Sequence, residues 1–230
     1  MLKHVPSKSQ FTSLALTFSF VLFMNTPVHA QGDGNLFENL EPVEGAKAAL
    51  VEIDPEADFT VYKRVNLLDA FVAFKKGWER NQQRSGSRMR ISTSDMERIK
   101  TDVSSLFNEV FAEVLAADDG YEIVDETGED VLLIRPAIID LDVVAPDTNS
   151  MSRGASFTAE TGSATIYVEL FDSSTSQIIG RAADRQTIRN AGDMVTWSNR
   201  VTNTAGARRL FTVWAQALRD FLDKHYMDAE

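Results

Sequence analysis

The strongest constraint on the fold is a long helical pattern in the middle of the chain. Ser94 and Glu97 form a capping box, in which a serine and a glutamate three residues later bond the first turn of a helix. We expect this helix to end near Ala117, with Gly120 supplying the left-handed conformation that ends many helices. Apolar residues follow at spacings of three and four and so share one face, which has to pack on another layer. The face comprises Met96, Ile99, Val103, Leu106, Phe107, Val110, Phe111, Val114 and Leu115.

Strands and a second helix are predicted in the rest of the chain. Apolar and polar residues alternate at 59–67, continuing through 71–74, which is typical of a half-buried strand. Residues 121–124, an acidic turn and an apolar run that continues past Pro136 to residue 144 indicate a hairpin or a bent strand pair. A strand at 164–170 is joined by a polar turn to another at 177–188, and we expect the two to pair antiparallel. A final amphipathic pattern carries Leu210, Phe211, Val213, Trp214, Ala217, Leu218, Phe221 and Leu222.

The order strand, helix, several strands, helix predicts an α+β fold. We expect a mostly antiparallel sheet with two long amphipathic helices packed on one face. Residues 59–230 are assigned to a single domain, and the acidic residues 31–58 to a lead-in segment laid over it. The chain contains no cysteine, so no disulfide can compensate for a weak core. A chain of this size buries roughly 70% of its unfolded surface, which is sufficient.

The first thirty residues predict export from the cytoplasm. Two lysines precede an uncharged, mostly apolar run at 13–24, whose length of about twelve residues suits a signal peptide and is too short to span a membrane. Val28 and Ala30 place small residues where signal peptidase reads them. We therefore predict a signal peptide at 1–30, cleaved between Ala30 and Gln31. An uncleaved N-terminal anchor is the alternative, and the short apolar run argues against it.

The predicted location is the periplasm. No second apolar stretch is long enough to span a membrane, so we expect no transmembrane segment in the mature chain. Without a cysteine the protein cannot be a lipoprotein, and any association with the outer membrane would be peripheral. The net charge is −11, and the predicted signal peptide removes two lysines and no acid. This acidity argues against nucleic acid as a partner, because binding to phosphates requires a basic face.

The motifs of common enzymes are missing. His4 and His29 fall in the predicted signal peptide, which leaves His225, placed in the last turn of the final helix where a cation is favourable. A Ser-His-Asp triad has no G-x-S-x-G sequence to support it. Neither a G-x-x-x-x-G-K-[ST] loop nor a G-x-G-x-x-G sequence is present. We therefore expect no enzyme activity, no cofactor and no metal.

Two carboxylates are the remaining candidates for catalysis. Asp140 and Asp142 alternate with Ile139 and Leu141, so they should share one face of a strand, about 7 Å apart. At that separation they could bind a hard cation or act as acid and base. The other interpretation, which we favour, is that they line the solvent face of an amphipathic strand.

A basic stretch gives the best candidate binding site. It spans residues 75–90 and contains six cations and one acid, Glu79, in an otherwise acidic chain. Arginine and lysine there could bind an anionic lipid headgroup, a phosphorylated glycan or an acidic protein. The alternative is a solvated loop that complements the acidic surface of the protein. Trp78 and Trp197 lie in or beside loops, where packing is favoured over a role in binding a ligand. The residues of this stretch that are candidates for binding an anion or a partner are Lys75, Lys76, Arg80, Arg84, Arg88 and Arg90.

Six separated motifs resemble the bacterial family known as domain of unknown function 3313. The motifs are YKRV (62–65), DAFVAFKKGW (69–78), SDMERIK (94–100), RPAIIDLDV (135–143), YVELFDSSTSQII (167–179) and WAQALRDFLD (214–223). The resemblance implies an exported protein of the Gram-negative envelope with no accepted enzyme activity or cofactor. Many members are described as lipoproteins, and this chain departs from them in having no cysteine.

These observations lead to three hypotheses of function. The first is a non-enzymatic binding or assembly module that contacts an envelope protein or an anionic envelope component. The second is a carrier or binder of an anionic lipid headgroup or glycan, which would use the basic stretch 75–90. The third is a hydrolase that depends on Asp140 and Asp142.

Overall fold

The computed structural model describes residues 37, 39–84, 91–143, 160–189 and 200–227, all within the unit Asn35–Glu230. The predicted signal peptide and its cleavage site at Ala30 and Gln31 lie outside the described residues, as do Arg88, Arg90 and Trp197. The elements are β1 (Glu41–Pro42), β2 (Leu50–Ile53), a 3-10 turn (Phe59–Val61), β3 (Arg64–Leu67), β4 (Phe71–Phe74), α1 (Trp78–Arg84), α2 (Thr93–Ala116), β5 (Glu122–Ile123), β6 (Val131–Val143), β7 (Glu160–Asp172), β8 (Ile178–Arg189) and α3 (Arg200–Met227).

The strands form one mixed sheet with the order β1-β2-β8-β7-β6-β3-β5, and β4 pairs with β6 beyond β3. The fold is α+β as predicted, but the prediction of a mostly antiparallel sheet is wrong. Strands β3 and β4 both run parallel to β6, and β3 runs parallel to β5. The long helix α2 connects β4 to the strands that follow, and a helical crossover returns the chain in the same direction. The predicted element order also lacked β1, β2 and α1.

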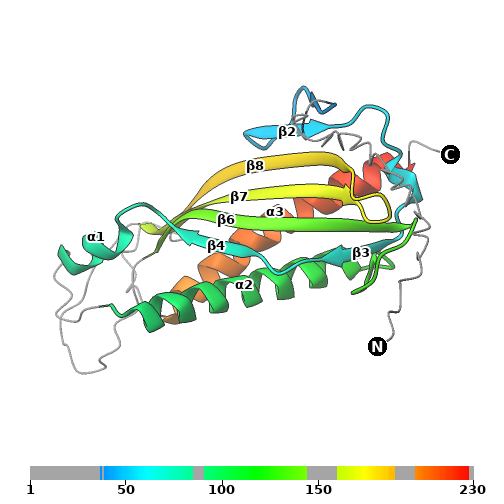
Figure 1. The fold of residues 1–230 in the computed structure, drawn as a ribbon. Helices are drawn as coiled ribbons and strands as arrows, with labels where there is room; N and C mark the ends of the chain where they lie inside the picture. The colour runs from blue at the N-terminus through cyan, green and yellow to red at the C-terminus, as the bar shows by residue number, and fades with distance from the viewer. Residues whose placement is uncertain (1–36, 38, 85–90, 144–159, 190–199, 228–230) are drawn as a thin grey trace, which may run out of the picture. The chain divides into compact units, whose positions relative to one another are not determined.

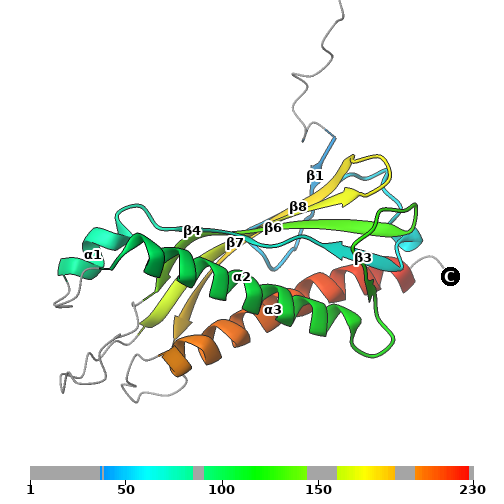
Figure 2. The same cartoon turned by 60° about the horizontal axis from the view of Figure 1, so that its bottom comes forward.

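The two long helices cover the same face of the sheet and lie side by side (Figures 1 and 2). Their contact surface is aromatic: the rings of Phe107 and Phe111 on α2 stack at 3.9 Å, and Phe211 on α3 meets Phe107 edge to face at 5.4 Å. All three are buried. Burial of such side chains stabilises the folded state by about 1.5–3 kcal/mol each. This layer is the core of the described unit.

Helix α2 begins two residues earlier than predicted. Ser92 is the N-cap, and its Oγ accepts the N–H of Asp95 at 3.1 Å. The Asp95 carboxylate accepts the N–H of Ser92 in return, also at 3.1 Å. Aspartate therefore fills the role that the sequence analysis gave to Glu97, and Ser94 lies inside the first turn.

The end of α2 is also built differently from the prediction. The left-handed residues are Asp118 (φ 48°) and Asp119 (φ 57°), and Gly120 is not among them. Gly120 is needed for space, because a Cβ there would collide with the carbonyl of Leu115 and with Arg219 of α3. The guanidinium of Arg219 donates to the Leu115 carbonyl at 3.0 Å, so a cation satisfies the last turn of α2.

The predicted strand at 59–67 begins only at Arg64. Asp58 accepts the N–H of Thr60 at 2.9 Å and starts the 3-10 turn in place of a strand. The expected hairpin does not form, because β5 pairs with β3 and not with β6; residues 131–143 are one strand, β6. Strands β7 and β8 pair antiparallel, as predicted.

Strand β6 contains a bulge near its end. Ile139 pairs with Thr165 of β7, whereas Asp142 pairs with Ser163, so β6 has one extra residue. Asp140 takes up this residue with a left-handed backbone, φ 52°. The buried side of the strand consequently changes from even to odd positions: Ile138 is buried, and after the bulge Leu141 is buried.

We predict that the two serines at the start of α2 differ in their contribution to stability. Ser92→Ala should lower the free energy of unfolding by about 1 kcal/mol, because it removes the N-cap oxygen. Ser94→Ala should change it by less than about 0.5 kcal/mol, since that residue is exposed on the helix surface. Urea denaturation followed by circular dichroism measures both values. A larger loss for Ser94→Ala would contradict the assigned cap.

Candidate functional site

The described part of the basic stretch, residues 75–84, follows the end of β4 and consists of a short turn and the helix α1, where a loop was expected. Gly77 makes the turn between them with φ 79°, a conformation that disfavours other residues. Trp78 then anchors α1: it is 1% exposed, its ring stacks on Phe74 at 4.1 Å, and its Nε1 donates to the Val143 carbonyl at 2.7 Å. The first turn of α1 is therefore fixed to the end of the sheet.

A groove of about 470 Å³ runs between β4, α1 and the start of α2. It contains three of the predicted cations, Lys75, Lys76 and Arg80. A fourth, Lys100, comes from α2 and was missed by the sequence analysis. Lys100 follows Met96, which also lines the groove, by one helical turn. This spacing is the sequence signal that places both side chains on one face of the helix. The backbone of Arg84 lies in α1, and its side chain is outside the described residues, as are Arg88 and Arg90.

The cations of the groove differ in their partners. Lys75 pairs with Asp142 at 2.7 Å, and Lys100 with Glu97 on the same helix at 2.8 Å. Such solvent-exposed pairs contribute little, so they can exchange for another anion. Lys76 and Arg80 are exposed and have no ion pair within the described part of the chain. The groove therefore presents positive charge to an incoming ligand, with Glu79 as the only acid among its lining residues.

One apolar side chain stands out at the far end of the groove. Phe71, at the first position of β4, is 66% exposed, the largest exposure among the large apolar residues that the structure describes. It lies on the groove wall together with the buried Val72. An exposed aromatic ring is a common feature of binding surfaces.

The two carboxylates considered for catalysis lie outside this groove. Asp140 sits in the bulge of β6 and Asp142 follows it, so the regular alternation assumed for the pair does not hold. Their side chains are 55% and 36% exposed. Each faces a different cation: Asp140 lies 3.7 Å from Arg185, and Asp142 bonds Lys75. His225 packs against the rings of Phe59 and Phe221.

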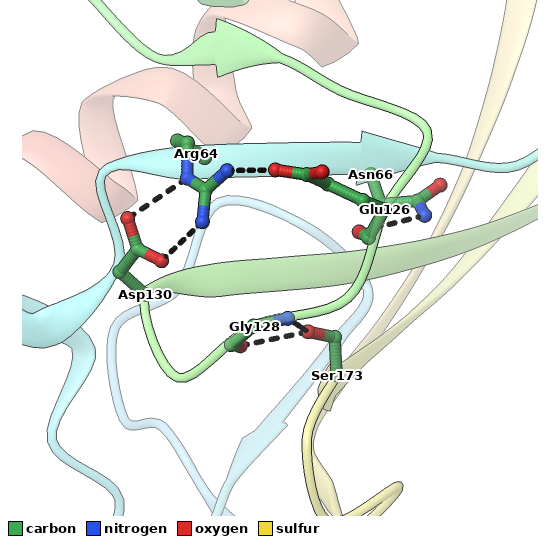
Figure 3. A network of polar contacts seen from close by, with 6 residues as sticks. All are labelled: Arg64, Asn66, Glu126, Gly128, Asp130 and Ser173. Carbon is green, nitrogen blue, oxygen red and sulfur yellow. Dashed lines mark hydrogen bonds and ion pairs between the residues drawn. The ribbon is translucent and has the colours of Figure 1, made fainter.

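The acidic turn before β6 forms a separate charged cluster (Figure 3). The guanidinium of Arg64 donates to both carboxylate oxygens of Asp130, at 2.9 and 2.6 Å, and also bonds Glu126. This pairing with Arg64 lowers the pKa of Asp130. Ser173 accepts the N–H of Gly128 at 3.0 Å and donates to its carbonyl at 2.9 Å. These contacts join β3, the acidic turn and the β7–β8 hairpin. We therefore assign this cluster a role in holding the fold together rather than in binding a ligand.

Asp172 holds the turn between β7 and β8. It accepts the N–H groups of Ser174 and Thr175 at 3.0 and 2.7 Å, and the hydroxyl of Tyr62 at 3.0 Å. Burial by itself raises the pKa of Asp172, but these hydrogen bonds outweigh it and hold the pKa at about 2. Burial and the bond to Asp172 raise the pKa of Tyr62.

The structure thus defines an α+β protein with a mixed sheet, two covering helices and a basic groove. A family model described as "Protein of unknown function (DUF3313)" matches residues 34–218. The chain belongs to this family, which confirms the resemblance seen in its motifs. Comparison with curated protein sequences gives no match. Within the described residues, no helix has the length and apolar character needed to cross a membrane.

Several solved structures resemble the chain distantly. The PelC dodecamer from Paraburkholderia phytofirmans aligns with 74% of this chain and 96% of its own, at 11% identity and a TM-score of 0.39. A structure titled as a neuraminyllactose-binding hemagglutinin homolog from Helicobacter pylori aligns with 82% of this chain and 95% of its own, at 11% identity and a TM-score of 0.35. These likenesses are too distant to inform the function.

We predict that Asp172 makes the folded state sensitive to acid. Its pKa is about 2 in the folded protein against 3.8 for an ordinary aspartate. The contribution of the ionised Asp172 to the free energy of unfolding is therefore fully present above about pH 4, and it is lost as the pH falls from about 4 to about 2. Asp172→Asn should reduce this part of the acid dependence, measured by urea denaturation at a series of pH values. Asp125→Asn, on an exposed turn, serves as the matched control. Equal acid profiles for the two variants would contradict the assignment.

Proposed function

We propose that this chain is a non-enzymatic binding module of the bacterial envelope, and that it captures an anionic component through the groove between β4, α1 and α2. The observation that carries the proposal is the positive charge of this groove, where Lys76 and Arg80 have no ion pair among the described residues. A basic concavity on an acidic protein favours anionic ligands.

The location and processing belong to the same proposal. Residues 1–30 act as a signal peptide, removed between Ala30 and Gln31, and residues 59–230, with β1 and β2 of the preceding segment added to their sheet, act as one domain in the periplasm. Family membership supports this assignment, since the resemblance to this family implies an exported protein of the envelope. The binding component is an envelope protein or another anionic envelope molecule.

A charge-removal experiment tests the use of the groove. The variant Lys76→Gln, Arg80→Gln, Lys100→Gln should weaken salt-sensitive binding to an anionic envelope component by about tenfold or more. The components to be tested are phosphatidylglycerol vesicles, lipopolysaccharide and the soluble proteins of an envelope fraction. Retention of the protein is measured at low and at high salt.

A control variant removes the same number of charges elsewhere. Lys47→Gln, Lys63→Gln, Lys224→Gln changes three exposed lysines outside the groove and should leave binding unchanged. Equal losses in the two variants, or binding that does not respond to salt, would overturn the role of the groove. Turnover of a hydrolase substrate panel that disappears on Asp140→Asn with Asp142→Asn would overturn the non-enzymatic assignment.

A further inference from the structure

The groove follows the edge of strand β4 rather than one of its faces. All four residues of β4, Phe71 to Phe74, line it, and the lining continues without a break to Arg80. Neighbouring side chains in a strand point to opposite faces, so a hollow that touches every residue in turn has to run along the backbone. Met96 and Lys100 of α2 form the opposite wall.

The backbone of β4 is paired on one side. Its only strand partner in the described part of the chain is β6, with Phe71 opposite Ala137 and Val72 opposite Ile138. The N–H of Lys75 continues this pairing and donates to the Leu141 carbonyl at 3.0 Å. Peptide groups alternate along a strand, so the N–H and C=O of Phe74 turn toward the groove. A strand edge beside a helix can accept an added strand.

We propose that the groove binds an extended acidic segment of a partner protein, which pairs with β4 as an additional strand. This inference rests on the proposed function and specifies the ligand. Main-chain hydrogen bonds to β4 hold the segment, and its carboxylates meet Lys76, Arg80 and Lys100. Phe71, exposed at the start of the strand, contacts an apolar side chain of the segment. A lipid headgroup would use the charge but leave the strand edge unpaired.

Two synthetic peptides test strand pairing separately from charge. One has ten residues of alternating glutamate and valine, and the other has the same sequence with an N-methyl group on every peptide nitrogen, so that neither edge can donate. The second peptide keeps the charge but loses the N–H groups that a strand donates. Protein purified from cells that express the full chain is titrated with each labelled peptide, and binding is followed by fluorescence anisotropy. The unmodified peptide should bind at least about tenfold more tightly, because several hydrogen bonds are lost from the other.

Further measurements decide between the possible outcomes. Amide hydrogen exchange should slow at Phe74 when the unmodified peptide is bound, and a lysine–valine peptide should not bind. Equal binding of the two acidic peptides would overturn strand pairing and leave the basic groove as an anion site. No binding of either peptide, together with vesicle binding that the Lys76, Arg80 and Lys100 substitutions abolish, would show that the ligand is a lipid surface and would also overturn this inference.

Discussion

Strand β6 is the element on which the rest of the structure depends. It pairs with β7 along one side, and with β3 and β4 one after the other along the opposite side. Its buried side chains, including Leu132, Ile134 and Ile138, form the floor on which α2 and α3 pack. The packing of the helical layer on β6 therefore depends on the register of this strand, because a shift by one residue would turn these side chains to the other face.

The bulge in β6 links this core to the candidate site. The extra residue at Asp140 restores burial at Leu141, whose carbonyl then accepts the N–H of Lys75. The last residue of the strand, Val143, accepts the indole N–H of Trp78 at 2.7 Å. The position of α1, and with it the cation Arg80, is thus set by how β6 ends. Core register and groove geometry are two consequences of one backbone irregularity.

The sequence predicted elements whose patterns are local, and it failed where long-range pairing decides. The helical periodicity around Phe107 and Phe111 was sufficient to identify α2, and the turn at Asp172 to identify the β7–β8 hairpin. The parallel pairing of β4 with β6 has no local signal, because it depends on the path of the chain through α2. The cations of residues 75–80 were predicted as a site, whereas Lys100 joins them only through tertiary packing.

The open edge of β4 would ordinarily be a liability, since an unpaired strand invites uncontrolled association. Natural sheets protect such edges with short strands and charged residues, and β4 has both: four residues, followed by Lys75 and Lys76. The same cations that repel a second basic edge would attract an acidic strand. The same arrangement of charge can therefore both protect the edge from aggregation and select an acidic partner. Protection alone does not explain why Phe71, the first residue of β4, exposes its apolar ring.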